Sequence, residues 1–295
     1  MGRPRVLVLG RSGQVGHQLI RAIPGSVGLG REEADLLRPD TLGDAVERYL
    51  PEVVINAAAD TAVDRAEAEF AAAWRANAVA PAALAEACRD RGIRLIHFST
   101  DYVFDGSQRT PYLESDPTAP VNAYGRAKLG GEESVLNADP KHLVFRLSWV
   151  YSARGRNFAL TMLRLAREGK PIRVVDDQIG SPTNARCIAD SIAEIVGHFL
   201  ALPEEPGGLF HLSAAGQTSW AGFAQSLLNE VFGGVAPTVE PIPTSAYPTP
   251  AARPAYSVLS NEKVQRRFGI RLPAWEDQLA LWAEDLNGPS LPGHC

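Results

Sequence analysis

A tyrosine and a lysine four residues apart, in Tyr124-Gly-Arg-Ala-Lys128, are the side chains best suited to chemistry in this sequence. On a helix, this spacing places both side chains on one face. A phenol ordinarily has a pKa of about 10, and a neighbouring ammonium group lowers it by favouring the phenolate. Tyr124 could then exchange a proton while Lys128 holds the ribose of a nicotinamide cofactor. The spacing is common by chance, so the pair needs support from its surroundings.

A strand-end hydroxyl provides part of that support. Residues 93–98 form an apolar run that predicts a buried strand, and Ser99-Thr100 follows it directly. Ligands of open α/β folds bind at the carboxyl ends of the strands, so Thr100 is placed to donate a hydrogen bond to a substrate carbonyl. His97 lies within the run, and we expect it to be a packed or hydrogen-bonded histidine instead of a base.

A glycine-rich turn provides further support for a coenzyme site beside the Tyr124–Lys128 pair. The apolar run at residues 6–9 leads into Gly10-Arg-Ser-Gly13-Gln-Val-Gly16, and a helical pattern follows. Glycines in such a turn let the backbone approach a pyrophosphate, and the helix N-terminus adds N–H groups and partial positive charge. The spacing is G-x-x-G-x-x-G, and its place between a strand and a helix predicts a dinucleotide site.

The residues after the second expected strand, near residues 26–30, help to distinguish NADPH from NADH as the coenzyme. A carboxylate at the first position would bind the ribose of NAD and repel a 2′-phosphate. Here Arg31 occupies this region, and Glu32 and Glu33 follow it. We therefore expect NADPH as cofactor, with NADH as the open alternative.

The elements around these residues alternate between strands and helices, which is typical of βαβ units. The expected fold class is α/β, a Rossmann-type doubly wound parallel sheet with a smaller mixed α/β substrate-binding domain. We expect the NADP(H)-binding Rossmann domain to span about residues 1–150. The substrate-binding domain takes mainly residues 151–287, discontinuously and with some return to the first domain, and residues 288–295 form a tail. The expected strands are 6–9, 26–30, 53–55, 93–98 and 142–147, and the expected helices are 67–89, 157–170, 186–202, 219–232 and 274–287.

Composition excludes several function classes. The 295 residues carry a formal charge of −5, with acidic and basic side chains interspersed, so a nucleic-acid footprint is absent. The three cysteines, Cys88, Cys187 and Cys295, have no paired spacing, which argues against disulfides and against zinc. Neither a signal-peptide pattern nor a membrane-spanning apolar run is present. We expect a cytoplasmic protein with no membrane partner.

With these residues in view, the chain resembles the dTDP-4-dehydrorhamnose reductases, a family of extended short-chain dehydrogenases/reductases. The resemblance covers about residues 5–285. It rests on several stretches that are specific only together. These are Gly10-Arg-Ser-Gly-Gln-Val-Gly16, Asn56-Ala-Ala-Ala-Asp-Thr-Ala-Val-Asp64, Ser99-Thr-Asp-Tyr-Val-Phe104, Tyr124-Gly-Arg-Ala-Lys128, Arg146-Leu-Ser-Trp-Val-Tyr151, Asp177-Gln-Ile-Gly-Ser-Pro-Thr183 and Ala246-Tyr-Pro-Thr-Pro-Ala-Ala-Arg-Pro254.

The resemblance implies a set of binding residues. On the cofactor side they are Gly10, Gly13, Gln14, Val15, Gly16, Arg31, Asp35, Leu36, Ala59, Asp60, Thr61, Phe98, Tyr124 and Lys128. On the substrate side they are Thr100, Asp101, Trp149 and Arg253, the last as a candidate for the substrate pyrophosphate.

The resemblance also implies a reaction, in which NADPH reduces the C4 ketone of a dTDP-linked 4-dehydro-L-rhamnose. Tyr124 would protonate the developing alkoxide, Lys128 would tune Tyr124, and Thr100 would polarise the ketone oxygen. Two residues depart from the family pattern. Asp60 replaces a frequent histidine, and Gln18 replaces the glutamate of members that form magnesium-linked dimers. We therefore expect neither a metal nor that dimer, and the oligomeric state stays open.

Three alternatives remain at this stage. A sugar-nucleotide dehydratase would need a second carboxylate after Asp101, where this chain has Tyr102. A reductase that gives another stereoisomer differs only in how the sugar lies. A non-catalytic NADP-binding regulatory subunit could share the fold, although Thr100, Tyr124 and Lys128 favour an enzyme.

Overall fold

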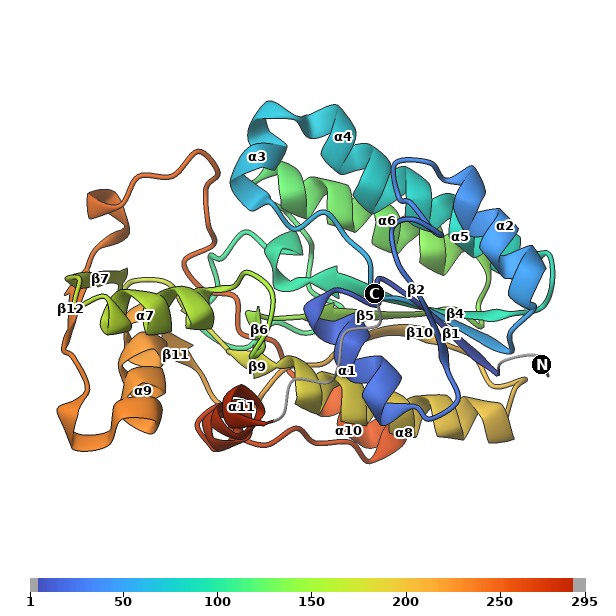
Figure 1. Ribbon diagram of the computed structural model, residues 1–295. Helices are drawn as coiled ribbons and strands as arrows, with labels where there is room; N and C mark the ends of the chain where they lie inside the picture. Colours follow the sequence, from blue (N-terminus) through green and yellow to red (C-terminus); the bar gives the residue numbers. More distant parts are fainter. Residues whose placement is uncertain (1–4, 289–295) are drawn as a thin grey trace.

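The computed structural model describes residues 5–288, so the expected tail at 288–295, Cys295 included, lies outside the described residues except for its first residue. A six-stranded parallel sheet forms its centre, in the order β2-β1-β3-β4-β5-β10 (Figure 1). Its strands β1, β3, β4 and β5 are buried along their whole length, as expected of apolar runs covered on both faces. The bounds are β1 Val6–Leu9, β2 Val27–Leu29, β3 Val53–Asn56, β4 Arg94–Thr100, β5 Leu143–Leu147 and β10 Gly208–His211.

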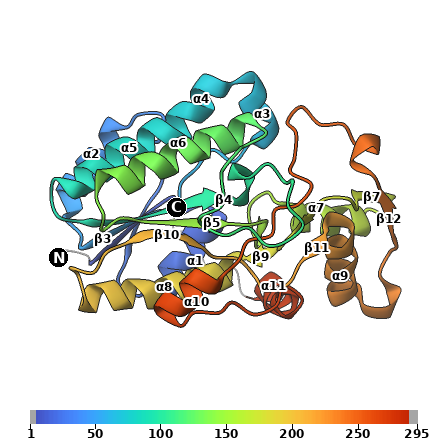
Figure 2. The ribbon, with the colours of Figure 1, turned by 180° about the vertical axis from the view of Figure 1, so that it is seen from behind.

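Helices cover both faces of this sheet (Figures 1 and 2). One face carries α2 Asp40–Tyr49, α5 Ala80–Arg89 and α6 Ala123–Ala138, and the other carries α1 Gln14–Ala22, α8 Ala185–Ala201 and α10 Glu262–Phe268. The expected doubly wound α/β fold is therefore confirmed. The strand order reverses between β1 and β3, and ligand sites of open α/β sheets form at such a switch point.

A second hydrophobic cluster lies beside the carboxyl ends of these strands. It contains α7 Phe158–Arg167, α9 Trp220–Phe232 and α11 Asp277–Asn287, together with the parallel strand pair β7 Ile172–Val175 and β12 Val239–Ile242. Three two-residue strands, β6 Val150–Tyr151, β8 Ile179–Gly180 and β9 Thr183–Asn184, connect it to the sheet layer. The chain returns to the large sheet at β10 and α8, so residues after 150 contribute to both clusters. Within residues 5–288, no helix is both long and apolar enough to cross a membrane.

The helix expected at residues 67–89 is wrong as a single element. The chain forms α3 Val63–Ala68 and α4 Phe70–Trp74, then a π-helical segment η1 Arg75–Val79, before α5 begins. Pro81 has no N–H to donate to the carbonyl of Asn77, which opens the α-helical ladder there. That carbonyl packs against Gly131 of α6, where a Cβ atom would lie 2.0 Å from the oxygen. The proline and the close packing together explain the interruption, a feature frequent at functional sites.

Candidate active site

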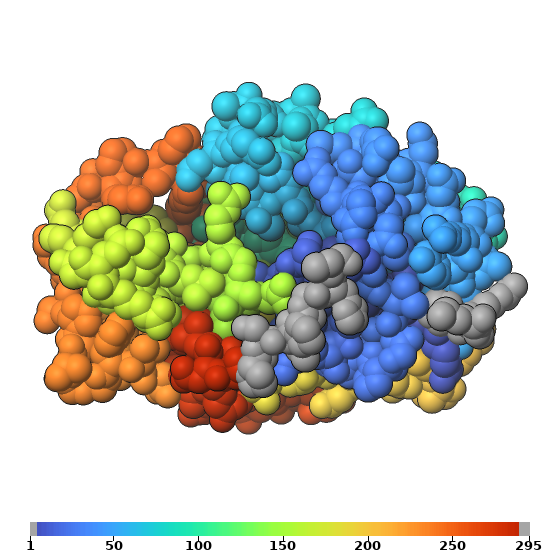
Figure 3. All heavy atoms as spheres, in the orientation of Figure 1, coloured from blue at the N-terminus to red at the C-terminus, as the bar shows by residue number. Residues whose placement is uncertain are grey.

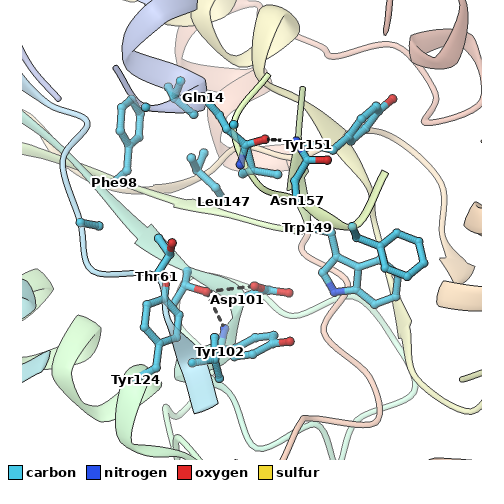
Figure 4. A pocket seen from close by; sticks show the side chains of 18 of the residues that line it. Gln14, Thr61, Phe98, Asp101, Tyr102, Tyr124, Leu147, Trp149, Tyr151 and Asn157 are labelled. Atoms are coloured by element: carbon cyan, nitrogen blue, oxygen red, sulfur yellow. Dashed lines mark hydrogen bonds between the residues drawn. The ribbon is translucent and has the colours of Figure 1, made fainter. Parts of the chain in front are cut away.

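A cavity of about 670 Å³ lies at the switch point, between the strand ends and the second cluster (Figure 4). The space-filling view is hollowed between the cyan helices and the yellow-green segment (Figure 3). Most of the predicted site residues meet in this cavity: Gly13, Gln14, Val15, Ala59, Thr61, Phe98, Thr100, Asp101, Tyr124, Lys128, Trp149 and Arg253. Residues from all along the chain therefore converge as the motifs predict.

The glycine turn forms one end of the cavity. Gly10 has a φ of +84°, and a Cβ there would lie 2.8 Å from the Ala58 nitrogen. A Cβ on Gly16 would lie 2.1 Å from the Gly10 carbonyl oxygen. These two glycines do not line the cavity, but they let the turn pack against the loop after β3. Gly13 begins α1 without a side-chain cap, and the first turn holds no acidic residue, which leaves N–H groups available for an anion.

Arg11, which the sequence reasoning missed, lies at the end of β2. Its guanidinium forms ion pairs with Glu32 and Glu33 and donates to the Gly28 carbonyl at 3.2 Å. The two carboxylates that follow Arg31 are thus partly offset by one positive charge from within the glycine turn. Arg31, by contrast, is exposed and lies 3.5 Å from Asp35.

Asp35 and Leu36, which the resemblance also places on the cofactor side, do not line the cavity. Asp35 accepts a hydrogen bond from the Leu37 amide, and that bond with the charges of Arg31 and Arg38 lowers its pKa despite some burial. Leu36 packs in the core beneath α2. Their contact with a cofactor stays a prediction.

The strand-end hydroxyl of Thr100 is already engaged with its neighbour. It donates to Asp101 Oδ1 at 3.1 Å and accepts from the Tyr102 amide at 3.2 Å (Figure 4). Ser148 donates to the other oxygen of Asp101 at 3.0 Å. Burial raises the pKa of Asp101 to about 6, while hydrogen bonds from Ser257, Ser148 and Thr100 oppose that rise. Asp101 therefore accepts hydrogen bonds as a buried carboxylate at neutral pH.

Tyr124 is buried in the cavity wall near the start of α6, and Asn122 caps that helix by accepting from the Gly125 amide. The expectation that Lys128 lowers the pKa of this phenol is not met. Burial is the largest influence and raises the pKa, the charge of Asp101 adds to it, and the hydrogen bond with Thr100 opposes it. Tyr124 therefore holds its proton at neutral pH and is suited to act as an acid.

Lys128 turns toward β4. Its Nζ donates to the Phe98 carbonyl at 2.5 Å and lies 3.4 Å from Nε2 of His97. Burial lowers the pKa of Lys128 to about 8, against the opposing charge of Glu132. His97 is buried and hydrogen-bonded, as the sequence predicts.

The loop after β3 presents Ala59 and Thr61 to the cavity but turns the side chain of Asp60 away. The Asp60 carboxylate pairs with Arg65 at 2.8 Å, and its expected contact with the cofactor stays a prediction. Asn77 fixes the loop by bonding both backbone groups of Asp60, at 3.1 and 2.8 Å. The sequence reasoning missed Asn77. The only local sign of an irregular helix there is Pro81, which cannot donate to the Asn77 carbonyl.

Aromatic side chains form the opposite wall. Trp149 stacks on Trp220 with ring centroids 3.5 Å apart, and Phe158 packs against Trp220 at 4.6 Å. Trp149 has a φ of +44°, a strained conformation of the kind that clusters at ligand sites. Gly180 makes room for it, because a Cβ there would lie 2.3 Å from the indole. Only Trp149 was predicted, because Phe158 and Trp220 lie on helices outside the motifs on which the resemblance rests.

A loop at residues 152–157 joins this wall to the glycine turn. The Oε1 atom of Gln14 accepts from Ser152 Oγ at 3.0 Å and from Asn157 Nδ2 at 2.7 Å. The loop brings Arg156 to the cavity, and the structure gives Arg156 no acidic partner within residues 5–288. This cation was also missed from the sequence.

Arg253 lines the cavity, but its guanidinium is held by Asp64. The two side chains form a bidentate ion pair at 2.6 and 2.7 Å. A role for Arg253 at a substrate pyrophosphate stays a prediction. Gln18, the other departure from the family pattern, is buried and donates to Asp285 at 3.1 Å.

Comparison with known proteins places the chain among the enzymes that it resembles. A family model described as the RmlD substrate binding domain matches residues 4–287. The dTDP-4-dehydrorhamnose reductase of Burkholderia thailandensis is 49% identical over 96% of this chain and 99% of its own. This chain belongs to the dTDP-4-dehydrorhamnose reductase family.

A solved structure and one further relative extend the comparison. The crystal structure of dTDP-4-dehydrorhamnose reductase from Bacillus anthracis, in complex with NADP, is 32% identical, has a TM-score of 0.88 and covers 95% of this chain and 99% of its own. A Streptomyces antibioticus protein is 42% identical over 93% of both chains. It is named a probable dTDP-4,6-dihydroxy-2-methyloxan-3-one 4-ketoreductase.

Proposed function

We propose that this chain is an oxidoreductase that uses NADPH to reduce the C4 ketone of dTDP-4-dehydro-L-rhamnose to dTDP-L-rhamnose. The observation that carries the proposal is the convergence of Thr100, Tyr124 and Lys128 on one cavity with the glycine turn of α1. The relatives' names supply the substrate, and the Bacillus anthracis complex supplies the coenzyme.

The glycine turn fits a dinucleotide pyrophosphate. The start of α1 carries no side-chain cap and no acidic residue, and Gly10 and Gly16 allow the close approach that the turn requires. Bound NADPH would supply the hydride. Arg11 supports the phosphorylated coenzyme, because its guanidinium near the end of β2 can exchange its pairing with Glu32 and Glu33 for a charge-assisted hydrogen bond to a 2′-phosphate.

Tyr124 acts as the general acid in this mechanism. Its buried phenol keeps its proton at neutral pH and gives it up to the stronger base, the alkoxide that forms at C4. Thr100 donates to the ketone oxygen after its hydroxyl turns away from Asp101. Asp101 still accepts the hydrogen bond from Ser148 in that state. Lys128 binds the ribose hydroxyls from the floor of the cavity.

The test is a coupled assay that generates dTDP-4-dehydro-L-rhamnose in the presence of NADPH or NADH. Coenzyme oxidation is followed optically, and NMR of the product gives the configuration at C4. We expect faster turnover with NADPH and the rhamnose configuration. The absence of oxidation with both coenzymes contradicts the proposal.

A second candidate is reduction of another dTDP-linked 4-keto sugar, as the name of the Streptomyces antibioticus relative indicates. The wall made by Trp149, Trp220 and Phe158 determines how the sugar lies against Tyr124. A larger kcat/KM with another dTDP-linked 4-keto-6-deoxy sugar in the same assay would favour this candidate.

A further inference from the structure

Three buried polar side chains form a row behind the cavity wall. Asn56 on β3, His97 on β4 and Lys128 on α6 are each 1–2% exposed. Asn56 and His97 are direct partners in the strand register. Only Lys128 reaches the cavity. Buried polar groups are costly unless they are paired, so the order of donors and acceptors in this row matters.

The orientation of Asn56 is set by the backbone. The Ala58 amide donates to Asn56 Oδ1 at 3.2 Å, and an N–H group can only donate. The amide nitrogen Nδ2 therefore points the other way, toward His97 Nδ1 at 3.1 Å. Because Nδ2 is a donor, Nδ1 must be the acceptor.

This assignment fixes the tautomer of His97. Burial, followed by the charge of Lys128, lowers the pKa of His97 well below its ordinary value, so the ring is neutral. A neutral ring that accepts at Nδ1 carries its proton on Nε2. The Nε2–H group then faces Lys128 Nζ at 3.4 Å and cannot accept from it. On this side, the Phe98 carbonyl is the acceptor for the lysine.

We propose that His97, held as its Nε2–H tautomer by Asn56, is a positioning residue for Lys128: it denies the lysine a second acceptor beside the Phe98 carbonyl on the strand side and so directs its remaining N–H groups into the cavity. There they meet the ribose hydroxyls of the coenzyme, a step that rests on the proposed function.

The charged groups around Lys128 act on it at a distance, but their hydrogen-bonding atoms are engaged elsewhere. On α6, Glu132 is held in a buried ion pair by Arg146 of β5. From the cavity side, Tyr124 keeps its proton and Asp101 is bonded to Thr100 and Ser148. Asn56 and His97 are neutral. The lysine therefore depends on the cavity for further acceptors.

The first test is the tautomer itself, measured by long-range ¹H–¹⁵N correlation NMR on the wild-type protein. His142 serves as an internal reference, because its Nδ1 accepts from the Leu95 amide at 3.3 Å and so its proton is also on Nε2. We expect His97 and His142 to show the same pattern. A proton on Nδ1 of His97, or a charged ring, overturns the proposal.

The second test is His97→Gln, which places a carbonyl oxygen within reach of Lys128. An acceptor on the strand side favours the charged ammonium and holds it there. We expect the Kd for NADP⁺ to rise about fivefold to tenfold, the effect of one lost hydrogen bond. We also expect the alkaline limb of the pH–rate profile to move up by about one pH unit.

The matched control is His142→Gln, which removes another buried histidine outside the cavity. It should lower stability without changing the Kd for NADP⁺ or the pH profile. Equal effects of the two variants would reduce His97 to a packing role and overturn the proposal. The NADP⁺ binding readout needs no substrate, so it separates this inference from failure of the proposed reaction, and the wild-type NMR test stands if His97→Gln does not fold.

Discussion

The two walls of the cavity are built in different ways. The wall from residues 1–147 consists of strand ends and helix starts, and its polar side chains are tied to backbone groups or to one another, as in Thr100, Asp101 and Lys128. The wall after residue 147 consists of loops and aromatic rings, with Arg156 facing the cavity. We infer that the first wall binds the coenzyme and performs the chemistry, while the second adds contacts that hold the coenzyme and the sugar. Variants of the catalytic groups in the first wall should change kcat or stability, and variants of the second should change binding at unchanged kcat.

The largest expected effect is that of Tyr124→Phe, which removes the proton donor. We expect kcat to fall by about 10² to 10⁴, while the Kd for NADP⁺ stays within about twofold, because the ring keeps its place against Tyr102. Stopped-flow measurement of NADPH oxidation and equilibrium binding check the two parts. Unchanged turnover would remove Tyr124 from the mechanism, and a regulatory effect on a partner protein that survives the substitution would support a binding subunit.

Lys128→Met tests how much the burial of a charged ammonium in the first wall lowers the free energy of unfolding. The pKa of Lys128 is lowered from 10.5 to about 8 by burial, so the folded state binds its proton less well than the unfolded chain. At pH 7 we expect the variant to gain about 2 kcal/mol in the free energy of unfolding, after allowance for the lost bond to the Phe98 carbonyl. The gain should be complete below about pH 8 and fade as the pH rises toward 10.5. Urea unfolding at several pH values measures it, and a gain that grows with pH would contradict the assignment.

Arg156→Gln tests the loop side of the second wall. The loop is tied to Gln14 at the glycine turn, so the guanidinium should contact the coenzyme pyrophosphate in a charge-assisted hydrogen bond. We expect the Kd for NADP⁺ to rise about tenfold, with kcat at saturation unchanged. Arg154→Gln is the matched control, since Arg154 lies in the same loop but does not line the cavity. If both variants bind NADP⁺ equally well, Arg156 has no such role.

The smallest effect is expected for Trp220→Leu, which removes the ring stacked on Trp149. An aromatic pair contributes about 0.5–1.5 kcal/mol beyond burial, so the KM for the sugar nucleotide should rise about fivefold. The KM for NADPH should stay the same. Steady-state kinetics with each substrate varied in turn measure both values, and an unchanged KM for the sugar nucleotide would remove Trp220 from the wall that holds the sugar.

The same division explains what the sequence could predict. The strand-end wall follows from local motifs, because a glycine turn, a hydroxyl after a strand and a Tyr–Lys pair each carry their own signal. Arg11 was missed although it lies within the turn, since its partners Glu32 and Glu33 are brought near only by the pairing of β1 with β2. Trp220 and Arg156 were missed for a related reason: helices and loops distant in sequence bring them to the cavity, and no local pattern records that contact.

The late return of the chain to the large sheet has a consequence during synthesis. β10 pairs with β5 through residues 208–211 and 143–146, and residues of the second cluster lie between them. Until residue 211 has left the ribosome, β5 is an open edge with unpaired N–H and C=O groups, a surface that invites pairing with other chains. Folding of the nascent chain therefore leaves the sheet incomplete until about seven tenths of the protein has emerged, and the chain is exposed to aggregation at this edge during that interval.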